Sequence, residues 1–211
     1  MPETNARHPS FGQSFARVGP RMDARGAADH RRRLLEAAYG AVVEIGAGYG
    51  ATFPFYPSAV TDVLALEPDP TLRELAVAAA AGAPVPVTVV DGVAEALPAA
   101  DASVDVVVSS LVLCSVADQS VALAEAARVL RPGGLLLFYE HVRSEHRVLA
   151  AVEDLVTPLW SRMAGGCHPN RNTAAVIAEA GFTVQGLERF GFSVLPGNPR
   201  LAHVLGAASK P

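Results

Sequence analysis

The sequence has few cysteines, no excess of positive charge and no long apolar run, and each absence excludes a class of protein. Only two cysteines occur among the 211 residues, Cys114 and Cys167, and they lie 53 positions apart. They form neither a disulfide framework nor a spaced zinc motif, and they fit a reducing cytosol. The formal net charge is −4, which argues against a general phosphate-binding surface, so nucleic acid is not an expected partner.

The most apolar stretch does not have the character of a membrane span. Residues 104–117 include Asp105 and three serines, and the stretch is shorter than the roughly 20 apolar residues that a membrane helix needs. The first ten residues are polar and include two prolines, unlike a secretory signal. We therefore expect a soluble, cytoplasmic protein with no integral membrane segment.

Continuous apolar runs of strand length alternate with alanine-rich helical segments, a pattern typical of a mostly parallel sheet covered by helices on both faces. Strands are expected over residues 42–45, 61–66, 85–90, 104–109 and 135–139. Helices are expected over residues 70–81, 119–130, 145–162 (broken at Pro158) and 173–180. Two last strands, 182–190 and 201–208, are joined by a short link with Pro196, Gly197 and Pro199, which suggests an antiparallel hairpin at the sheet edge.

A glycine-rich loop follows the first expected strand. Gly46, Gly48 and Gly50 carry no Cβ, so the backbone can turn tightly at the strand end and approach a ligand. The run from Gly46 to Ala51 also satisfies the dinucleotide fingerprint G-x-G-x-x-A, and Glu67 stands 21 positions after Gly46 at the end of the second strand. A carboxylate there suits ribose hydroxyls in either fold. These features indicate an adenosine ligand and leave NAD and S-adenosylmethionine both open.

Three details favour S-adenosylmethionine. Glu44 lies inside the strand before the loop, where a dinucleotide fold normally places an apolar residue. The segment after the loop, residues 51–57, carries two prolines and so lacks the sound helix N-terminus that a pyrophosphate needs. The turn over residues 130–134, Leu-Arg-Pro-Gly-Gly, is typical of methyltransferases.

Four segments, in the expected order, resemble the successive motifs of class I S-adenosylmethionine-dependent methyltransferases with a type 11 methyltransferase domain. They are residues 43–48, 66–70, 104–108 and 128–134. A narrower set resembles the thiol S-methyltransferase-like branch, whose animal members are membrane-anchored enzymes that methylate alkyl thiols. It consists of residues 51–57, 110–116, 140–142 and 166–167.

The resemblance implies which residues bind S-adenosyl-L-methionine. Gly46, Ala47 and Gly48 would line the methionine part of the cofactor beside Glu44, and Glu67 would hold the ribose. The other expected cofactor contacts are Pro68, Gly92, Val93, Ala94 and Ser109, of which residues 92–94 would border the adenine. Many relatives carry an aspartate where Val93 stands, so the adenine amino group must here meet a backbone carbonyl, Asp91, Glu95 or water.

The acceptor is expected past the fourth and fifth strands, because open α/β sheets bind ligands at the C-terminal ends of their strands. His141 is the best-placed titratable group and our candidate catalytic residue, and a structural role fits it equally well. The candidate substrate contacts are Cys114, Tyr139, Cys167, His168 and Arg171. For Cys114 and Tyr139 a core position is the alternative. The local pair Cys167-His168 supplies too few ligands for zinc, so no metal is expected.

Methyl transfer from a sulfonium requires aligned donor and acceptor and, for some acceptors, removal of a proton. A thiol ionises near pH 8.5 and needs little help from a base, whereas a phenol or an amine would use a histidine. We therefore expect methylation of a small molecule, with a thiol as the first choice. The alternatives are O-, N- or C-methylation of a phenol, amine or lipid-like metabolite, and a cofactor-binding protein without turnover.

One domain of the α/β class accommodates all of these features. We expect a Rossmann-like, doubly wound sheet of seven strands, mostly parallel with an antiparallel last strand. Residues 1–40 would form a helical cap, which either covers the core or acts as a lid over the cofactor. Residues 41–140 would form the cofactor-binding core, and residues 141–211 the acceptor-side helices and the terminal hairpin.

Overall fold

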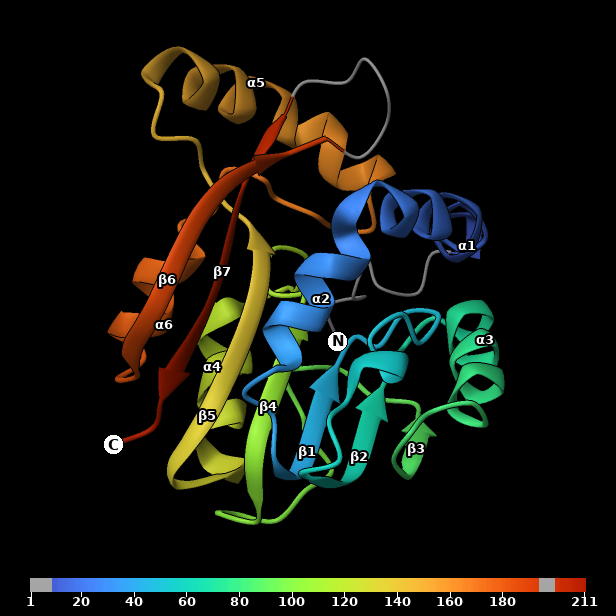
Figure 1. Cartoon of the computed structure of the whole chain (residues 1–211). Helices are drawn as coiled ribbons and strands as arrows, with labels where there is room; N and C mark the ends of the chain where they lie inside the picture. The colour runs from blue at the N-terminus through green and yellow to red at the C-terminus, as the bar shows by residue number, and fades with distance from the viewer. Residues whose placement is uncertain (1–8, 194–199) are drawn as a thin grey trace.

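The computed structural model describes residues 9–193 and 200–211 and contains a seven-stranded sheet in the order β3-β2-β1-β4-β5-β7-β6 (Figure 1). Neighbouring strands run parallel except for β7, which is antiparallel to both β5 and β6. The predicted doubly wound sheet with an antiparallel last strand is therefore confirmed. The strands are β1 (Gly40–Ile45), β2 (Val60–Leu66), β3 (Val87–Val90), β4 (Val104–Ser110), β5 (Leu130–His141), β6 (Thr183–Phe192) and β7 (Leu201–Ser209).

Helices cover both faces of this sheet. The helices are α1 (Pro9–Met22), α2 (Ala28–Leu35), α3 (Pro70–Ala80), α4 (Gln119–Val129), α5 (Arg147–Met163) and α6 (Thr173–Glu179). Leu35 of α2 and Ala76 of α3 belong to the core on one face, and Leu123 of α4 and Ile177 of α6 belong to the core on the other. Helices α1 and α5 lie beyond the C-terminal ends of the parallel strands (Figure 1). They therefore cover the edge where ligands of such sheets bind.

The central strand β4 shows why the apolar runs are continuous. Side chains alternate between the two faces of a strand, and here both faces are covered. Val106 and Val108 belong to the core that α2 and α3 cover, whereas Val107, between them, belongs to the core under α4 and α6. The part of a strand that lies between two apolar layers has no polar face, so residues 106–108 read as a continuous apolar run.

Two predicted boundaries are wrong. Helix α5 continues through Pro158 to Met163, and the turn before the proline has an added hydrogen bond, because the Thr157 hydroxyl donates to the Glu153 carbonyl (2.6 Å). Strand β5 begins at Leu130 rather than at residue 135, because Leu130 pairs with Val104 of β4. Further along, Gly133 and Gly134 bond the backbone of Lys210 beyond β7. The predicted hairpin pairing of the last two strands is confirmed, while its link with Pro196, Gly197 and Pro199 lies outside the described residues.

The described part of the N-terminal segment bends sharply between α1 and α2. A wide helical turn over Asp23–Ala27 joins them, with Gly26 at a φ of 122°. Asp23 pairs with the buried Arg31 of α2, which fixes the bend. Helix α2 then packs on the sheet while α1 extends over its C-terminal edge (Figure 1).

Within residues 9–193 and 200–211, no helix combines the length and the apolar composition that crossing a bilayer requires.

Candidate active site

The glycine-rich loop follows β1, which lies between β2 and β4 in the sheet. The chain builds the sheet outward on one side from β1 to β3 and then crosses to the other side with β4, so the loop lies where the strand order reverses. Gly46 and Gly48 have φ values of 60° and 59°, a region that residues with a Cβ rarely adopt. A Cβ on Gly46 would also lie 2.6 Å from a methyl group of Val112. The predicted tight turn is therefore present, and the loop packs directly against the segment that follows β4.

Glu67 lies at the end of β2 and contacts this loop. Its Oε2 accepts a hydrogen bond from the backbone N–H of Gly48 (2.7 Å), and its Oε1 accepts one from the backbone N–H of Asp69 (2.9 Å). Burial raises the pKa of Glu67 to about 7. The structure thus brings together the loop and the carboxylate that sequence reasoning paired. That Glu67 holds a ribose stays a prediction.

Glu44 stabilises the other side of the loop. Its carboxylate accepts hydrogen bonds from the hydroxyls of Thr52 (2.6 Å) and Tyr56 (2.7 Å), both in the segment after the loop. Burial raises the pKa of Glu44 to about 7. That segment forms only a short 3₁₀ turn, Phe53–Phe55, as its prolines predict. The described contacts of Glu44 fix the shape of the loop, and its contact with the cofactor stays a prediction.

The expected adenine-side residues follow β3. A Cβ on Gly92 would lie 2.6 Å from Leu66 of β2, so the chain passes closely over that strand end. Val93 forms an isolated bridge with Ala96, and Ala94 is buried in the core. Of the two acids near Val93, Glu95 accepts the backbone N–H of Ala117 (2.9 Å).

Arg73 of α3 contacts both Asp91 and the chain after β2. Its Nη1 lies 3.2 Å from Oδ1 of Asp91 and also donates to the carbonyl oxygens of Glu67 (2.7 Å) and Pro68 (3.2 Å). One guanidinium therefore joins the ends of β2 and β3, where the ribose and the adenine are expected.

Helix α1 lies over the glycine-rich loop. The rings of Phe15 and Tyr49 are 5.8 Å apart, and a Cβ on Gly48 would be 3.5 Å from Phe15. The Tyr49 hydroxyl donates to Asp23, in the turn that follows α1. The N-terminal segment thus both covers the sheet, through α2, and contacts the cofactor loop, through α1.

Glu140, to which sequence reasoning gave no role, organises the segment after β4. This fully buried carboxylate accepts the Ser109 hydroxyl (2.5 Å) and the backbone N–H groups of Val112 (3.1 Å), Leu113 (3.0 Å) and Cys114 (3.1 Å). Burial raises its pKa. Ser109, expected to contact the cofactor, has its described hydrogen bond to Glu140. The signal that could have identified Glu140 in the sequence is an acidic residue within the apolar end of a strand.

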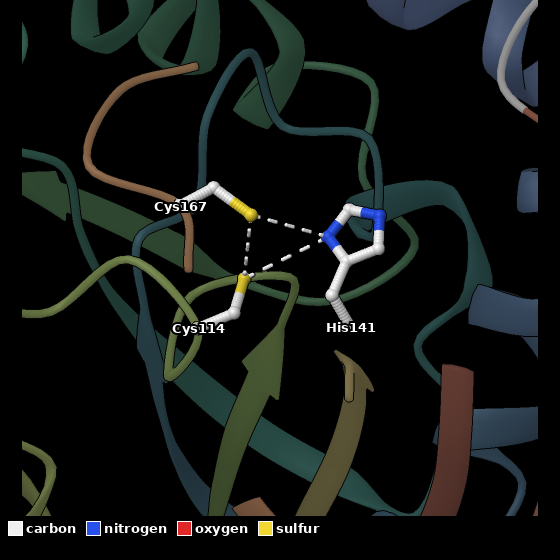
Figure 2. A group of neighbouring side chains, drawn as sticks. All are labelled: Cys114, His141 and Cys167. Carbon is white, nitrogen blue, oxygen red and sulfur yellow. Dashed lines mark hydrogen bonds between the residues drawn. The ribbon is translucent and has the colours of Figure 1, made fainter. Parts of the chain in front are cut away.

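Three of the predicted acceptor-side residues converge on one point. Cys114 follows β4, His141 ends β5, and Cys167 lies in the turn after α5; Figure 2 shows their side chains pointing toward one another. The two sulfurs are 3.6 Å apart, and Nδ1 of His141 lies 3.4 Å from Sγ of Cys167 and 3.8 Å from Sγ of Cys114. Both cysteines are free thiols. All three side chains are buried.

His203 of β7, a second residue that sequence reasoning missed, packs against His141 with ring centroids 4.3 Å apart. The two residues face each other in the β5–β7 pairing. Burial lowers the pKa of His203 to about 2, so its ring stays neutral and is a weak base. No local motif marks it, because strand pairing alone brings it to the site.

The other predicted substrate contacts are engaged within the protein. Nδ1 of His168 lies 2.6 Å from the carbonyl oxygen of Gly166. Arg171 donates to the carbonyl oxygens of Leu113 and Val116 (both 2.8 Å), and the Tyr139 hydroxyl bonds Nδ1 of His30 (3.1 Å). Arg171 thus holds the Cys114 segment in place, and Tyr139 lies in the core. Direct contact of these residues with an acceptor stays a prediction.

Known proteins are similar to this chain in sequence and in fold. The family profile of the methyltransferase domain matches residues 43–138. Thiol S-methyltransferase TMT1B of Rattus norvegicus is 35% identical over 175 residues, which cover 80% of this chain and 70% of that protein. The enzyme of the same name from Homo sapiens is 35% identical over 176 residues, 81% of this chain and 70% of that protein. A solved structure of an S-adenosylmethionine-dependent methyltransferase from Thermotoga maritima has a TM-score of 0.72 at 21% identity, covering 96% and 97% of the two chains.

The fold, the glycine-rich loop and these relatives all indicate the same family. The chain belongs to the class I S-adenosylmethionine-dependent methyltransferases, in the family of the thiol S-methyltransferases. It is therefore a methyltransferase that uses S-adenosylmethionine, as its motifs predict.

Proposed function

We propose that this enzyme transfers the methyl group of S-adenosylmethionine to the sulfur of a small-molecule thiol. The observation that carries the proposal is the 35% identity over 70% of the rat thiol S-methyltransferase. The alignment extends well beyond the cofactor-binding segments, since it covers 80% of this chain. It therefore takes in residues outside the part of the chain that all class I methyltransferases share.

The chemistry of the acceptor end supports a thiol. The Tyr139 hydroxyl is bonded to His30, Nδ1 of His141 faces two sulfurs, and burial makes His203 a weak base. A phenol or an amine would need one of these groups to take its proton. A thiol has a pKa of about 8.5 and supplies its own nucleophilic anion. A thiol is thus the acceptor that this end of the molecule suits best.

We assign the cofactor to the loop and the strand ends described above. In this proposal Gly46, Ala47 and Gly48 line the methionine part and Glu67 accepts the ribose hydroxyls. Residues 92–94 border the adenine. Helix α1 acts as a lid, which its contacts with the loop support. His141, Cys114 and Cys167 are our candidates for the residues that act on the acceptor.

We further propose that the substrate is a small metabolite and that the protein works in the cytoplasm. The segment after β4, which carries Cys114, packs through Val112 against Gly46 of the glycine-rich loop, so the acceptor and cofactor regions adjoin, which favours a compact acceptor. Both cysteines are free and buried, which suits a reducing compartment.

A matched set of acceptors tests the thiol. Benzyl mercaptan, benzyl alcohol and benzylamine share one carbon skeleton and differ only in the nucleophilic atom. We expect methylation of the mercaptan alone, detected as the methyl thioether by mass spectrometry together with S-adenosylhomocysteine. Calorimetric titration with S-adenosylmethionine, without an acceptor, checks that the cofactor site is intact. Methylated alcohol or amine without thioether would refute the thiol assignment and support the alternative acceptors.

A further inference from the structure

The cluster of Cys114, His141 and Cys167 draws on three separate parts of the chain. The three potential ligand atoms all lie within 4.8 Å of one another. They come from the loop after β4, the end of β5 and the turn after α5, and Figure 2 shows both sulfurs facing the same imidazole nitrogen. The chain has no other cysteine, so both of its thiols lie in this cluster.

Hydrogen bonds alone do not account for this triangle of atoms. A thiol has one proton to donate, and Nδ1 of a neutral imidazole makes one hydrogen bond, either as donor or as acceptor. Two thiols and one neutral imidazole therefore satisfy at most two of the three edges. All three edges are nevertheless short, at 3.4, 3.6 and 3.8 Å. A cation at the centre would use a lone pair from each of the three atoms.

The spacing matches a tetrahedral zinc site. With Zn–S of about 2.3 Å and Zn–N of about 2.0–2.1 Å, tetrahedral angles place two sulfurs about 3.8 Å apart and a sulfur and a nitrogen about 3.6 Å apart. The observed sulfur–sulfur distance is 3.6 Å, and the two sulfur–nitrogen distances are 3.4 and 3.8 Å. We infer that Cys114, His141 and Cys167 bind one zinc ion, whose fourth position takes the sulfur of the acceptor.

The type of donor supports zinc over the harder cations. Thiolate and imidazole select soft or borderline metals, whereas magnesium and calcium require oxygen. Nε2 of His141 is buried and has no hydrogen-bond partner within residues 9–193 and 200–211. Placing the proton on this nitrogen leaves the lone pair of Nδ1 free to coordinate.

The surrounding hydrogen bonds position the ligands in advance. Glu140 accepts the backbone N–H of Cys114 (3.1 Å), and the carbonyl oxygen of Cys114 accepts the backbone N–H of His168 (2.8 Å). The second bond joins the two cysteine-bearing loops directly. Arg171 strengthens the same junction through the carbonyl oxygens of Leu113 and Val116. Outer contacts of this kind orient metal ligands and raise metal affinity.

The described residues supply three ligands, one fewer than tetrahedral zinc takes, and three protein ligands are the number found in catalytic zinc sites. The loop that carries Cys114 also carries Val112, which packs against Gly46 of the cofactor loop. The metal would therefore lie on the acceptor side of the bound cofactor. This step rests on the proposed thiol methylation.

Zinc in this position would activate the acceptor. A thiol that coordinates zinc loses its proton, here to solvent, and is held as the thiolate. A sulfur lone pair then forms a bond to the methyl carbon of the sulfonium. The bond from that carbon to the sulfonium sulfur breaks, and its electron pair stays on the sulfur of S-adenosylhomocysteine. The neutral thioether is a weaker zinc ligand and dissociates.

Metal analysis of the full chain tests the site. Purified without chelators, the protein should contain about one zinc ion per chain, the number that one three-ligand site binds. Cys114→Ser, Cys167→Ser and His141→Gln should each lose this zinc. His146→Gln, which changes an exposed histidine five positions beyond His141, should retain it. Circular dichroism and cofactor titration establish whether each variant is folded.

Cobalt substitution of the unmodified protein makes the test independent of variant folding. Co²⁺ should give the visible bands of a tetrahedral site and thiolate-to-cobalt charge-transfer bands in the near ultraviolet. Adding benzyl mercaptan should shift these bands, and adding benzyl alcohol should not. A chain without zinc, and without a cobalt spectrum after reconstitution, overturns the site even when thiols are methylated. A cobalt spectrum that does not change when benzyl mercaptan is added overturns the proposal that the acceptor sulfur takes the fourth coordination position. Bound zinc together with methylation of alcohols or amines alone refutes the proposed function and leaves the metal site standing.

Discussion

The carboxylate of Glu67, at the end of β2, accepts a 2.7 Å hydrogen bond from the backbone N–H of Gly48. Gly48 holds a positive φ of 59°, so the bond couples an ionisable side chain to a loop whose shape depends on glycine. Burial raises the pKa of Glu67 to about 7. The protonation state of one residue therefore changes near neutral pH at the place where the ribose is expected.

The affinity for S-adenosylmethionine should depend on pH through Glu67. Ribose hydroxyls donate to the ionised carboxylate, which predominates above the pKa of about 7 in the free enzyme. Affinity should be full above pH 7 and should fall by up to about tenfold for each pH unit below it, because binding then requires loss of the proton. Calorimetric titration from pH 5.5 to about 8.5 measures this slope.

Two variants isolate the contribution of Glu67. Glu67→Gln should weaken binding by about 10–100-fold, since it removes charged hydrogen bonds, and it should flatten the pH profile. Glu74→Gln changes an exposed acid on α3 and should leave both affinity and slope unchanged. A Glu67→Gln protein that keeps the wild-type slope would show that another group titrates.

The contact between Gly46 and Val112 should limit what the loop tolerates. Gly46→Ala places a Cβ 2.6 Å from a Val112 methyl group and forces an alanine to a φ of 60°. The backbone conformation alone costs about 1–2 kcal/mol, and the clash adds to it. We expect a lower free energy of unfolding in urea and weaker cofactor binding.

The double variant separates the two causes. Val112→Ala in the Gly46→Ala background should relieve the clash and recover part of the stability, but not the part due to φ. Val112→Ala alone supplies the third corner of the double-mutant cycle. A coupling free energy of zero would mean that the two residues do not press on each other.

The sheet was predictable because its causes are local. Apolar runs such as residues 106–108 of β4 are continuous, since both faces of the sheet are buried, and the glycine-rich loop is marked by residues adjacent in sequence. The boundaries failed where distant groups decide them. Strand β5 starts early because Leu130 pairs with Val104 of β4 and Gly133 bonds the backbone of Lys210, and no nearby residue signals either pairing.

The acceptor end was predictable only as a set of separate residues. Cys114, His141 and Cys167 were each candidates, but their convergence depends on three loops and on the backbone bond between Cys114 and His168. Looking for zinc ligands in a local motif paired Cys167 with His168, whereas the fold pairs Cys167 with Cys114 and His141. The role of Glu140 was hidden because backbone N–H groups, which occur in almost every residue, are three of its four partners.

Gly19→Ala should loosen the proposed lid. An alanine in a helix is normally more stable than a glycine by about 0.5–1 kcal/mol, so the sign of the effect is informative. At position 19 the new Cβ would lie 2.2 Å from the Tyr49 ring, and we expect destabilisation instead. Trypsin should cleave α1 faster at Arg17 and Arg21, and S-adenosylhomocysteine should dissociate faster.

Gly82→Ala is the matched control for that substitution, because its nearest neighbour, a carbonyl oxygen, lies 3.7 Å from the added Cβ. It should be neutral or slightly stabilising. Unchanged trypsin cleavage in Gly19→Ala, with unchanged cofactor release, would argue that α1 does not act as a lid.

Glu140→Gln should disorganise the segment that carries Cys114. The carboxylate accepts four hydrogen bonds, from Ser109, Val112, Leu113 and Cys114. An amide has one acceptor oxygen, so its NH₂ group would face a backbone N–H, donor against donor. Leaving such buried donors unsatisfied costs about 1–3 kcal/mol. We expect the free energy of unfolding to fall by about that amount and the affinity for zinc to fall by about 10–100-fold.

Ser109→Ala is the matched control for Glu140→Gln. It removes one hydroxyl donor and leaves the three backbone bonds, so it should cost only about 1 kcal/mol and should spare zinc binding. Urea denaturation and competition with a chromophoric zinc chelator measure the two effects separately. If Glu140→Gln lowers stability no more than Ser109→Ala does, the carboxylate is not what holds this segment in place.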